Sequence, residues 1–351
     1  MSKSFRSITT IARVSALLVA VCCYGAGCGE MAMPPAGSYS EVLLVTEEGA
    51  RSEWTELLKP LIAREHDYYV DIEEAFRVTP IKASEMDEFP AYKNIVICGV
   101  LDSSTDVGQA IIRLIGDSGV ERVWKEGAQI LKKEDKPAFN QLTLIVTATD
   151  DDALRQTIAE RGDEVADILE ASCRERLRRY LLKRQNEKVA TDLGKRYGFH
   201  LKVPSLYRLL SDESGGTGAA APAGVELIRE PPTRILGVYW VDRQEAPALA
   251  DEDELFEIRA DYVWKRYDQD QMDRDRTEFE AVRLGTHSAI RMSGYWFNDT
   301  SVMGGYYETY FVYDDRAELL WAIDLLVLAP GKPKHPLVRE LRALAETIQF
   351  D

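Results

Sequence analysis

The chain has 351 residues, with 43 Lys and Arg against 59 Asp and Glu, so its formal net charge is −16 at pH 7. Apolar residues make up 45% of the chain and charged residues 29%, which is typical of a globular protein and excludes a disordered or multi-span membrane protein. The acidic balance argues against a nucleic-acid binder, because such proteins need clustered Lys and Arg. The length predicts two domains, since one core rarely exceeds about 250–300 residues.

The first residues have the layout of an export signal. Three basic residues and no acid precede an apolar run at 14–26, which is too short to cross a bilayer. Small residues at 25–27 stand directly before Cys28. This arrangement resembles a bacterial lipoprotein signal, in which the lipidated cysteine becomes the first residue of the mature chain. We predict a signal peptide at 1–27 and lipidation at Cys28; the alternatives are an ordinary secretory signal or a short buried helix.

The remaining chain has no other apolar run long enough to cross a membrane. The sequence therefore predicts a body that is tethered to the membrane through lipidated Cys28. Gly29 and Glu30 follow, with no Asp next to the cysteine. In lipoproteins of diderm bacteria this resembles cargo for the outer membrane. The predicted location is the cell envelope, on the periplasmic face of the outer membrane.

Two stretches with little apolar character divide the chain. Residues 28–40 are rich in Pro, Gly and Ser and form the predicted tether. Residues 211–224 are of low complexity and predict a flexible insertion. A long helical pattern stops near residue 198, so we place the two domains at 41–197 and 198–351.

The first half alternates strand-like and helix-like segments, which is typical of an α/β layer with strands covered by helices. From 151 to 197 the apolar residues recur at helical spacing beside a dense charged face, which predicts one long connecting helix. The other predicted strands and helices of this half are strands at 41–46, 74–80, 93–100 and 141–148, and helices from Ser52, at 107–115 and at 119–131.

Strand-like segments outnumber helices in the second half. Two helices are predicted, one opening with acids at 251–254 and one starting at Pro336. A mostly antiparallel sheet packed by helices satisfies this pattern, so the predicted fold class is α+β: an α/β layered domain, a long connecting helix and an antiparallel C-terminal sheet. The predicted strands are 198–204, 225–229, 234–242, 279–285, 288–297, 306–314 and 320–329.

Two cysteines remain in the body of the chain. Cys98 lies in a buried strand-like run and Cys173 on the long helix. An exported protein could join them in a disulfide. We predict two buried free thiols instead, because Cys is among the most buried residue types.

Six short motifs follow one another along the mature chain: Glu41-Val-Leu-Leu-Val-Thr with Trp54, Lys93-Asn-Ile-Val-Ile, Phe199-His-Leu-Lys-Val-Pro-Ser-Leu-Tyr, Gly294-Tyr-Trp, Met303-Gly-Gly and Leu328-Ala-Pro-Gly-Lys-Pro-Lys. Their order and spacing resemble an uncharacterised envelope lipoprotein family, domain of unknown function 4837. The resemblance extends over essentially the whole mature chain. Two positions depart from the family pattern: Ser293 replaces an arginine ahead of the Gly-Leu-Trp motif, and Tyr306-Tyr307 replace Pro-Phe. The family has no assigned activity, so the resemblance implies an envelope location and no chemistry.

Catalytic and metal-binding motifs are weak throughout. The tetrapeptide at 116–119, Gly-Asp-Ser-Gly, matches the nucleophile motif of trypsin-like proteases, but it lies between two helical patterns, where a helix end and a cap explain it. The acidic stretch at 268–275 starts like a calcium loop, but Asp273 stands where an EF-hand needs Gly. The histidines lack zinc spacing, and His66-Asp67 is interpreted as a surface pair at a helix end. No cofactor or metal is predicted.

The best candidate for a binding surface is a glycine-aromatic hairpin. Paired glycines allow close approach of a partner, and strand alternation would leave one aromatic pair exposed as an anchor. The alternative, which we favour, is a hairpin turn with its aromatics in the core. The candidate residues are Trp296, Gly304, Gly305, Tyr306 and Tyr310.

These observations predict a non-catalytic binding or assembly component of the envelope. The expected partner is an envelope protein or glycan, besides the membrane itself and to the exclusion of nucleic acid. The alternative is an envelope hydrolase whose site is assembled from distant residues, because catalytic groups need only meet in space.

Overall fold

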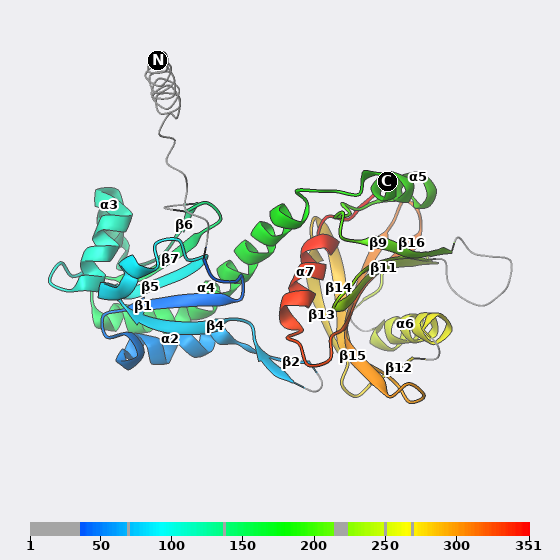
Figure 1. The fold of residues 1–351 in the computed structure, drawn as a ribbon, viewed down its shortest axis with the longest axis horizontal. Helices are drawn as coiled ribbons and strands as arrows, with labels where there is room; N and C mark the ends of the chain where they lie inside the picture. Colours follow the sequence, from blue (N-terminus) through cyan, green and yellow to red (C-terminus); the bar gives the residue numbers. More distant parts are fainter. Residues whose placement is uncertain (1–35, 69–70, 136–137, 214–223, 249–250, 268–269) are drawn as a thin grey trace, which may run out of the picture.

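The computed structural model describes residues 36–351 apart from 69–70, 136–137, 214–223, 249–250 and 268–269 (Figure 1). Two sheets, each with its own helices, lie on either side of helix α4 (Asp151–Leu181), which runs from beneath the first sheet toward the second. The α+β fold class is therefore confirmed. The predicted signal peptide and Cys28 lie outside the described residues.

The first sheet has five strands in the order β4-β1-β5-β7-β6, and only β6 runs antiparallel to its neighbour. Helices α2 and α4 cover one face and α3 covers the other. The central strands are buried on both faces, which is why their sequences are continuous apolar runs rather than alternating ones. The bounds are β1 (Glu41–Thr46), η1 (Gly49–Arg51), α2 (Glu53–Ala63), β4 (Arg77–Lys82), η2 (Ala83–Glu88), β5 (Asn94–Val100), α3 (Asp106–Glu126), β6 (Ala128–Glu134) and β7 (Leu142–Ala148).

Two local details of this half follow from the sequence. The Ser52 side chain caps α2 by accepting from the Trp54 amide at 3.3 Å. Gly116 interrupts α3 with a left-handed φ of 65°, so the Gly-Asp-Ser-Gly tetrapeptide lies at a break between two helical segments, as predicted. The tether is shorter than predicted, because Ala36 already pairs with Tyr92 beside the first sheet.

The helix predicted for 151–197 is two helices. It breaks after α4, and α5 (Glu187–Tyr197) starts where the Asn186 side chain accepts from the Val189 amide at 3.3 Å. Gly198 then ends α5 in the left-handed conformation. The prediction of a single helix was wrong because the apolar spacing continues across the break, while the signal for a new start is one capping residue.

The second sheet is antiparallel and has the strand order β12-β14-β15-β16-β11-β10-β9, with β13 also paired to β14. Helix α7 packs on one face and α6 on the other. Two short pairs, β8 with β17 and β2 with β3, lie outside it. The bounds are β2 (Glu65–Asp67), β3 (Ile72–Glu74), β8 (Phe199–His200), β9 (Arg208–Glu213), β10 (Gly224–Arg229), β11 (Thr233–Asp242), α6 (Glu252–Arg266), β12 (Gln271–Met272), β13 (Glu278–Leu284), β14 (His287–Asn298), β15 (Met303–Asp314), β16 (Leu319–Leu328), α7 (His335–Ala345) and β17 (Gln349–Phe350).

The insertion predicted at 211–224 is narrower in the structure. Residues 211–213 belong to β9 and Gly224 begins β10, so the strands extend into the low-complexity stretch from both ends. Residues 214–223 lie outside the described part. None of the helices in the described ranges is both long and apolar enough to cross a membrane.

Cys98 and Cys173 are both free and buried, which confirms the prediction for these two residues. Burial raises the pKa of both thiols. We therefore expect Cys98 and Cys173 to resist thiol reagents in the folded protein. After unfolding without reductant, peptide mapping should find both residues labelled, whereas a mass that fits a bridge between them would contradict the structure.

Candidate ligand cleft between the two sheets

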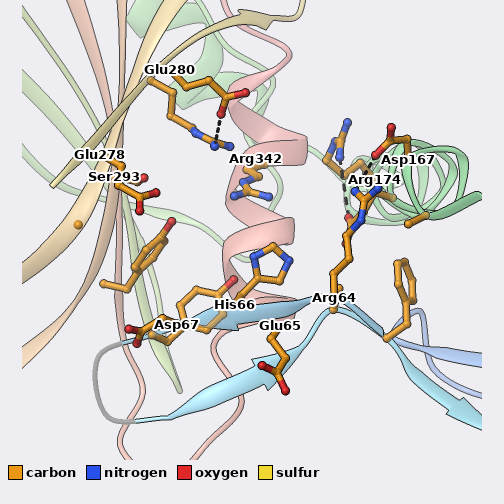
Figure 2. Close-up of a pocket in the computed structure, with 18 of the residues that line it drawn as sticks. Arg64, Glu65, His66, Asp67, Asp167, Arg174, Glu278, Glu280, Ser293 and Arg342 are labelled. Atoms are coloured by element: carbon orange, nitrogen blue, oxygen red, sulfur yellow. Dashed lines mark hydrogen bonds and ion pairs between the residues drawn. The ribbon is translucent and has the colours of Figure 1, made fainter. Parts of the chain in front are cut away.

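A cleft of about 970 Å³ lies between the two halves of the molecule (Figure 2). One wall is formed by the end of α2, by β2 and by α4, and the other by β13, β14, β15 and α7. Figure 2 shows His66 on β2 beneath Arg342 of α7, with Arg64 on one side and Asp67 on the other. Charged side chains from segments far apart in sequence thus converge here.

His66 lines the floor of this cleft and stacks on the buried His335. The rings of His66 and His335 have centroids 4.5 Å apart. His335 is buried, with Nδ1 at 2.6 Å from the Tyr68 hydroxyl and Nε2 at 3.0 Å from Glu170. Burial lowers the pKa of both rings, to about 4 for His66, where His335 and Arg342 add to the effect. His66 is therefore a neutral imidazole on the cleft floor at pH 7.

An ion pair holds His335 from behind. Arg339 donates to Glu170 through Nε at 2.9 Å and through Nη2 at 2.5 Å, and also to the Ser40 hydroxyl at 2.9 Å. Burial alone would raise the pKa of Glu170, but its hydrogen bonds with His335 and Arg339 hold that pKa well below its ordinary value. The cluster joins α4 to α7 and to the start of the first sheet, so it fixes the relative position of the two walls.

A second buried cluster supports the wall formed by the C-terminal sheet. Glu308 is completely buried and accepts from Arg342 Nε at 2.8 Å and from the hydroxyls of Tyr306 and Tyr310 at 2.8 and 2.9 Å. Burial opposes ionisation, but Arg342 lowers the pKa of Glu308 to about 2. The carboxylate therefore stays charged and orients Arg342 at the back of the cleft.

The cations of the cleft walls are paired. Arg64 bonds Asp163 and Asp167, Arg174 bonds Glu346, Arg276 bonds Asp67 and Arg291 bonds Glu280. In contrast, three exposed carboxylates of the cleft have no hydrogen bond or ion pair within the described part of the chain. They are Glu65, Asp275 and Glu278. The cleft thus offers unpaired negative charge.

The structure supports the favoured interpretation of the glycine-aromatic hairpin, with aromatics in the core, and contradicts the hypothesis of an exposed aromatic pair. Trp296 is 4% exposed and Tyr310 5%, and Tyr307 and Phe311 on the opposite face are also buried. The physical reason is that the sheet is covered on both faces, by α7 over Tyr310 and by α6 over Tyr307. Tyr306 is partly buried and lines the cleft.

The glycine pair also has a packing explanation. A Cβ on Gly305 would come within 2.6 Å of the Val327 carbonyl oxygen and 2.8 Å of Trp296 Nε1, so the neighbouring strands leave no room for a side chain. Gly304 and Gly305 line a second, more apolar cleft of about 890 Å³ at the end of the sheet, beside the exposed Met303.

The prediction of His66-Asp67 as a surface pair at a helix end is wrong. Both residues lie on strand β2 and line the cleft. His335, on which His66 stacks, lies at the start of α7, and no local spacing connects the two. Ser293, which departs from the family pattern, also lines the cleft.

The structure also describes the acidic stretch at 268–275, apart from residues 268–269. Asp270 accepts from the Asn298 amide at 2.8 Å and Asp273 adjoins β12. Within the described ranges, no group of three or more His, Cys, Asp or Glu is arranged to hold a metal ion.

Comparisons with known proteins give a match of part of the chain to a family model and low similarity to two solved structures. Among solved structures, the chain is similar to a protein from Bacteroides thetaiotaomicron with 10% identity and a TM-score of 0.29. That match covers 44% of this chain and 45% of the other, so this chain spans less than half of it. LpqN of Mycobacterium tuberculosis, described as involved in cell envelope biogenesis, matches with 16% identity and a TM-score of 0.28, over 43% of this chain and 82% of LpqN.

No curated protein matches the chain. Residues 257–347, from α6 to the end of α7, match the family described as a domain of unknown function, DUF4837. The matched part supplies β13, β14, β15 and α7, which form one wall of the cleft. The predicted resemblance to this family is thereby confirmed over residues 257–347; over the rest of the chain it stays a prediction.

Proposed function

We propose that the protein is a non-catalytic binding component of the cell envelope. It is held on the periplasmic face of the outer membrane through lipidated Cys28, and it binds an extended basic segment of another envelope protein. The signal layout at 1–28 supports the location. The cleft of about 970 Å³ between the two halves carries the proposal for the ligand.

Two features of the cleft favour an extended basic segment. Strand β13 forms part of one wall, and among the strands of the described residues it pairs only with β14, so its other edge is available for an added strand. The exposed carboxylates Glu65, Asp275 and Glu278 supply complementary charge around that edge. Main-chain hydrogen bonds would give affinity, and the carboxylates would give a preference for Lys and Arg.

A hydrolase is less well supported by the same cleft. Ser293 and His66 both line it, but within the described residues neither has a hydrogen bond to the other. His335 contacts an acid, Glu170, but its Nδ1 faces the hydroxyl of Tyr68 rather than a serine. A nucleophile, base and acid in one chain of contacts is what acyl transfer needs.

The binding proposal is tested with a photo-crosslinking amino acid at Glu280, on the cleft, and at Trp124, exposed on α3. In intact cells the Glu280 probe should give one crosslinked envelope protein that the Trp124 probe does not. Adding Glu65→Lys and Glu278→Lys should abolish that product while the melting temperature stays within a few degrees. A product that survives both charge reversals, or that forms equally from Trp124, would refute the cleft as the site.

Lipidation is tested separately. Cells labelled with an acyl precursor should incorporate label into the wild-type chain and not into Cys28→Ser, and the variant should leave the membrane fraction. Label in the variant would show that another residue carries the lipid. This result does not depend on what the cleft binds.

A further inference from the structure

The chain is acidic, yet one segment is strongly basic. Residues 174–202 contain ten Lys and Arg against three Asp and Glu, an excess of seven positive charges in a chain of net charge −16. They cover the last two turns of α4, the connection to α5, and α5 itself. Charge segregation of this kind creates a local field of opposite sign to that of the whole molecule.

The exposed cations of this segment lie along the end of α4, the α4–α5 connection, α5 and the residues after β8, and together they are called the basic face. Two apolar side chains lie within it: Tyr180 is 58% exposed, with the Lys183 ammonium 5.8 Å from its ring centroid, and Leu206 is 57% exposed. The Ser205 amide donates to the Arg184 carbonyl at 2.9 Å, which places Leu206 beside the α4–α5 connection. The exposed cations of the basic face are Arg179, Lys183, Arg184, Lys188, Lys195, Arg196 and Lys202.

The start of the described chain packs against α4 near the basic face. Tyr39 packs against α4: its carbonyl accepts from Asn94 at 3.1 Å, and the Arg176 guanidinium lies 5.7 Å from its ring centroid. Lys183 follows Arg176 by seven residues on α4 and its connection, about 10 Å along a helix axis. Cys28 precedes Ala36, the first described residue, by eight residues, which span at most about 29 Å. A membrane holding Cys28 is therefore within reach of the basic face.

We propose that the basic face binds the anionic phospholipid surface of the membrane to which the chain is tethered. Each Lys or Arg near such a surface contributes roughly a fivefold gain in affinity, and Tyr and Leu side chains suit the boundary between headgroups and acyl chains. This inference rests on the proposed function in one respect: the proposed lipid anchor at Cys28 determines which membrane the basic face contacts. Docking would orient the protein with α5 at the membrane and with β2 and the far end of β15 pointing away (Figure 1).

The test uses the full chain with Cys28→Ser, so that no lipid contributes. Its association with vesicles of phosphatidylcholine plus phosphatidylglycerol is compared with its association with phosphatidylcholine alone. The apolar residues at 14–26 act in both cases, so the difference measures the electrostatic contribution. We expect Lys183→Glu, Arg184→Glu and Lys188→Glu together to lower binding to the anionic vesicles at least about tenfold, and added salt to have a similar effect.

The matched control is Arg113→Glu, Arg122→Glu and Lys125→Glu, three exposed cations of α3 that change the net charge equally. This control should lower binding only slightly. Equal losses in the two triple variants, or equal binding of the parent chain to both kinds of vesicle, would overturn the proposal. Because the chain lacks the lipid and the cleft is unchanged, neither result reports on lipidation or on the cleft ligand.

Discussion

Replacing Asp324 with alanine should destabilise the protein by about 3–5 kcal/mol, because it leaves a buried guanidinium without its counter-charge. Arg259 is 0% exposed and Asp324 1%. Arg259 donates to Asp324 through Nε at 2.8 Å and through Nη2 at 3.1 Å, and its guanidinium lies 3.6 Å from the Tyr307 ring centroid. Chemical denaturation should show a lower midpoint with an unchanged slope.

Two controls separate burial of charge from simple loss of an ion pair. Asp261→Ala removes the exposed partner of Lys265 on the same helix and should cost under about 1 kcal/mol. The double variant Arg259→Met with Asp324→Leu removes both buried charges and should recover much of the lost stability. If Asp324→Ala costs no more than Asp261→Ala, then Arg259 reaches solvent and α6 does not cover the sheet as the structure has it.

The layered fold of the first half could be predicted because the signals for its strands and helices lie in short stretches of sequence. Strands β1, β5 and β7 are continuous apolar runs, and helices with one apolar face follow them. Two features failed: the boundary that one residue decides, Asn186 at the start of α5, and strand β6, whose first residues were predicted as the end of a helix at 119–131. Strand β9 was missed because Arg208–Glu213 combines apolar and charged residues next to a low-complexity stretch, and pairing with β10 determines its conformation.

The candidate cleft could not be predicted, because its parts meet only through tertiary packing. Tyr68 and His335 are 267 residues apart, and Glu170 comes from a third segment. The hypothesis of an exposed aromatic pair on the hairpin failed for a related reason. Alternation along β15 correctly separates Tyr306 and Tyr310 from Tyr307 and Phe311, but local sequence does not reveal that two distant helices cover both faces.

The protein should lose stability as the pH falls from about 7 to about 5, and His66 should account for a large part of this loss. Burial, His335 and Arg342 lower the pKa of His66 to about 4, outweighing the opposite effects of Glu170 and Glu308. In the unfolded chain the pKa is about 6.5. Between these values the unfolded chain takes up a proton that the folded protein does not, so the stability present above pH 6.5 is lost on the way down to pH 4.

After allowance for the partial exposure of His66, the contribution is on the order of 2 kcal/mol over the whole window. Burial also lowers the pKa of His335, so that ring acts in the same direction. Glu170, whose pKa is held below its ordinary value, makes a contribution that is lost only under more acidic conditions, below about pH 4.5. The window between about pH 6.5 and 5 therefore reports mainly on the histidines, and the free energy of unfolding should be measured at its two ends.

The variant His66→Phe distinguishes the contribution of His66 to this loss of stability from that of His335. Phenylalanine keeps a flat ring over His335 and takes up no proton in either state, so the loss of stability between pH 7 and pH 5 should shrink while the stability at pH 7 changes little. His200→Gln is the control, since His200 lies on β8 with Asp351 as its partner, away from the cleft. If His66→Phe loses as much stability on acidification as the wild type, the stacked histidine is not the acid-sensitive group. In that case the contact between the two halves is held by the ion pair of Arg339 with Glu170, which persists at pH 5, and not by the neutral form of His66.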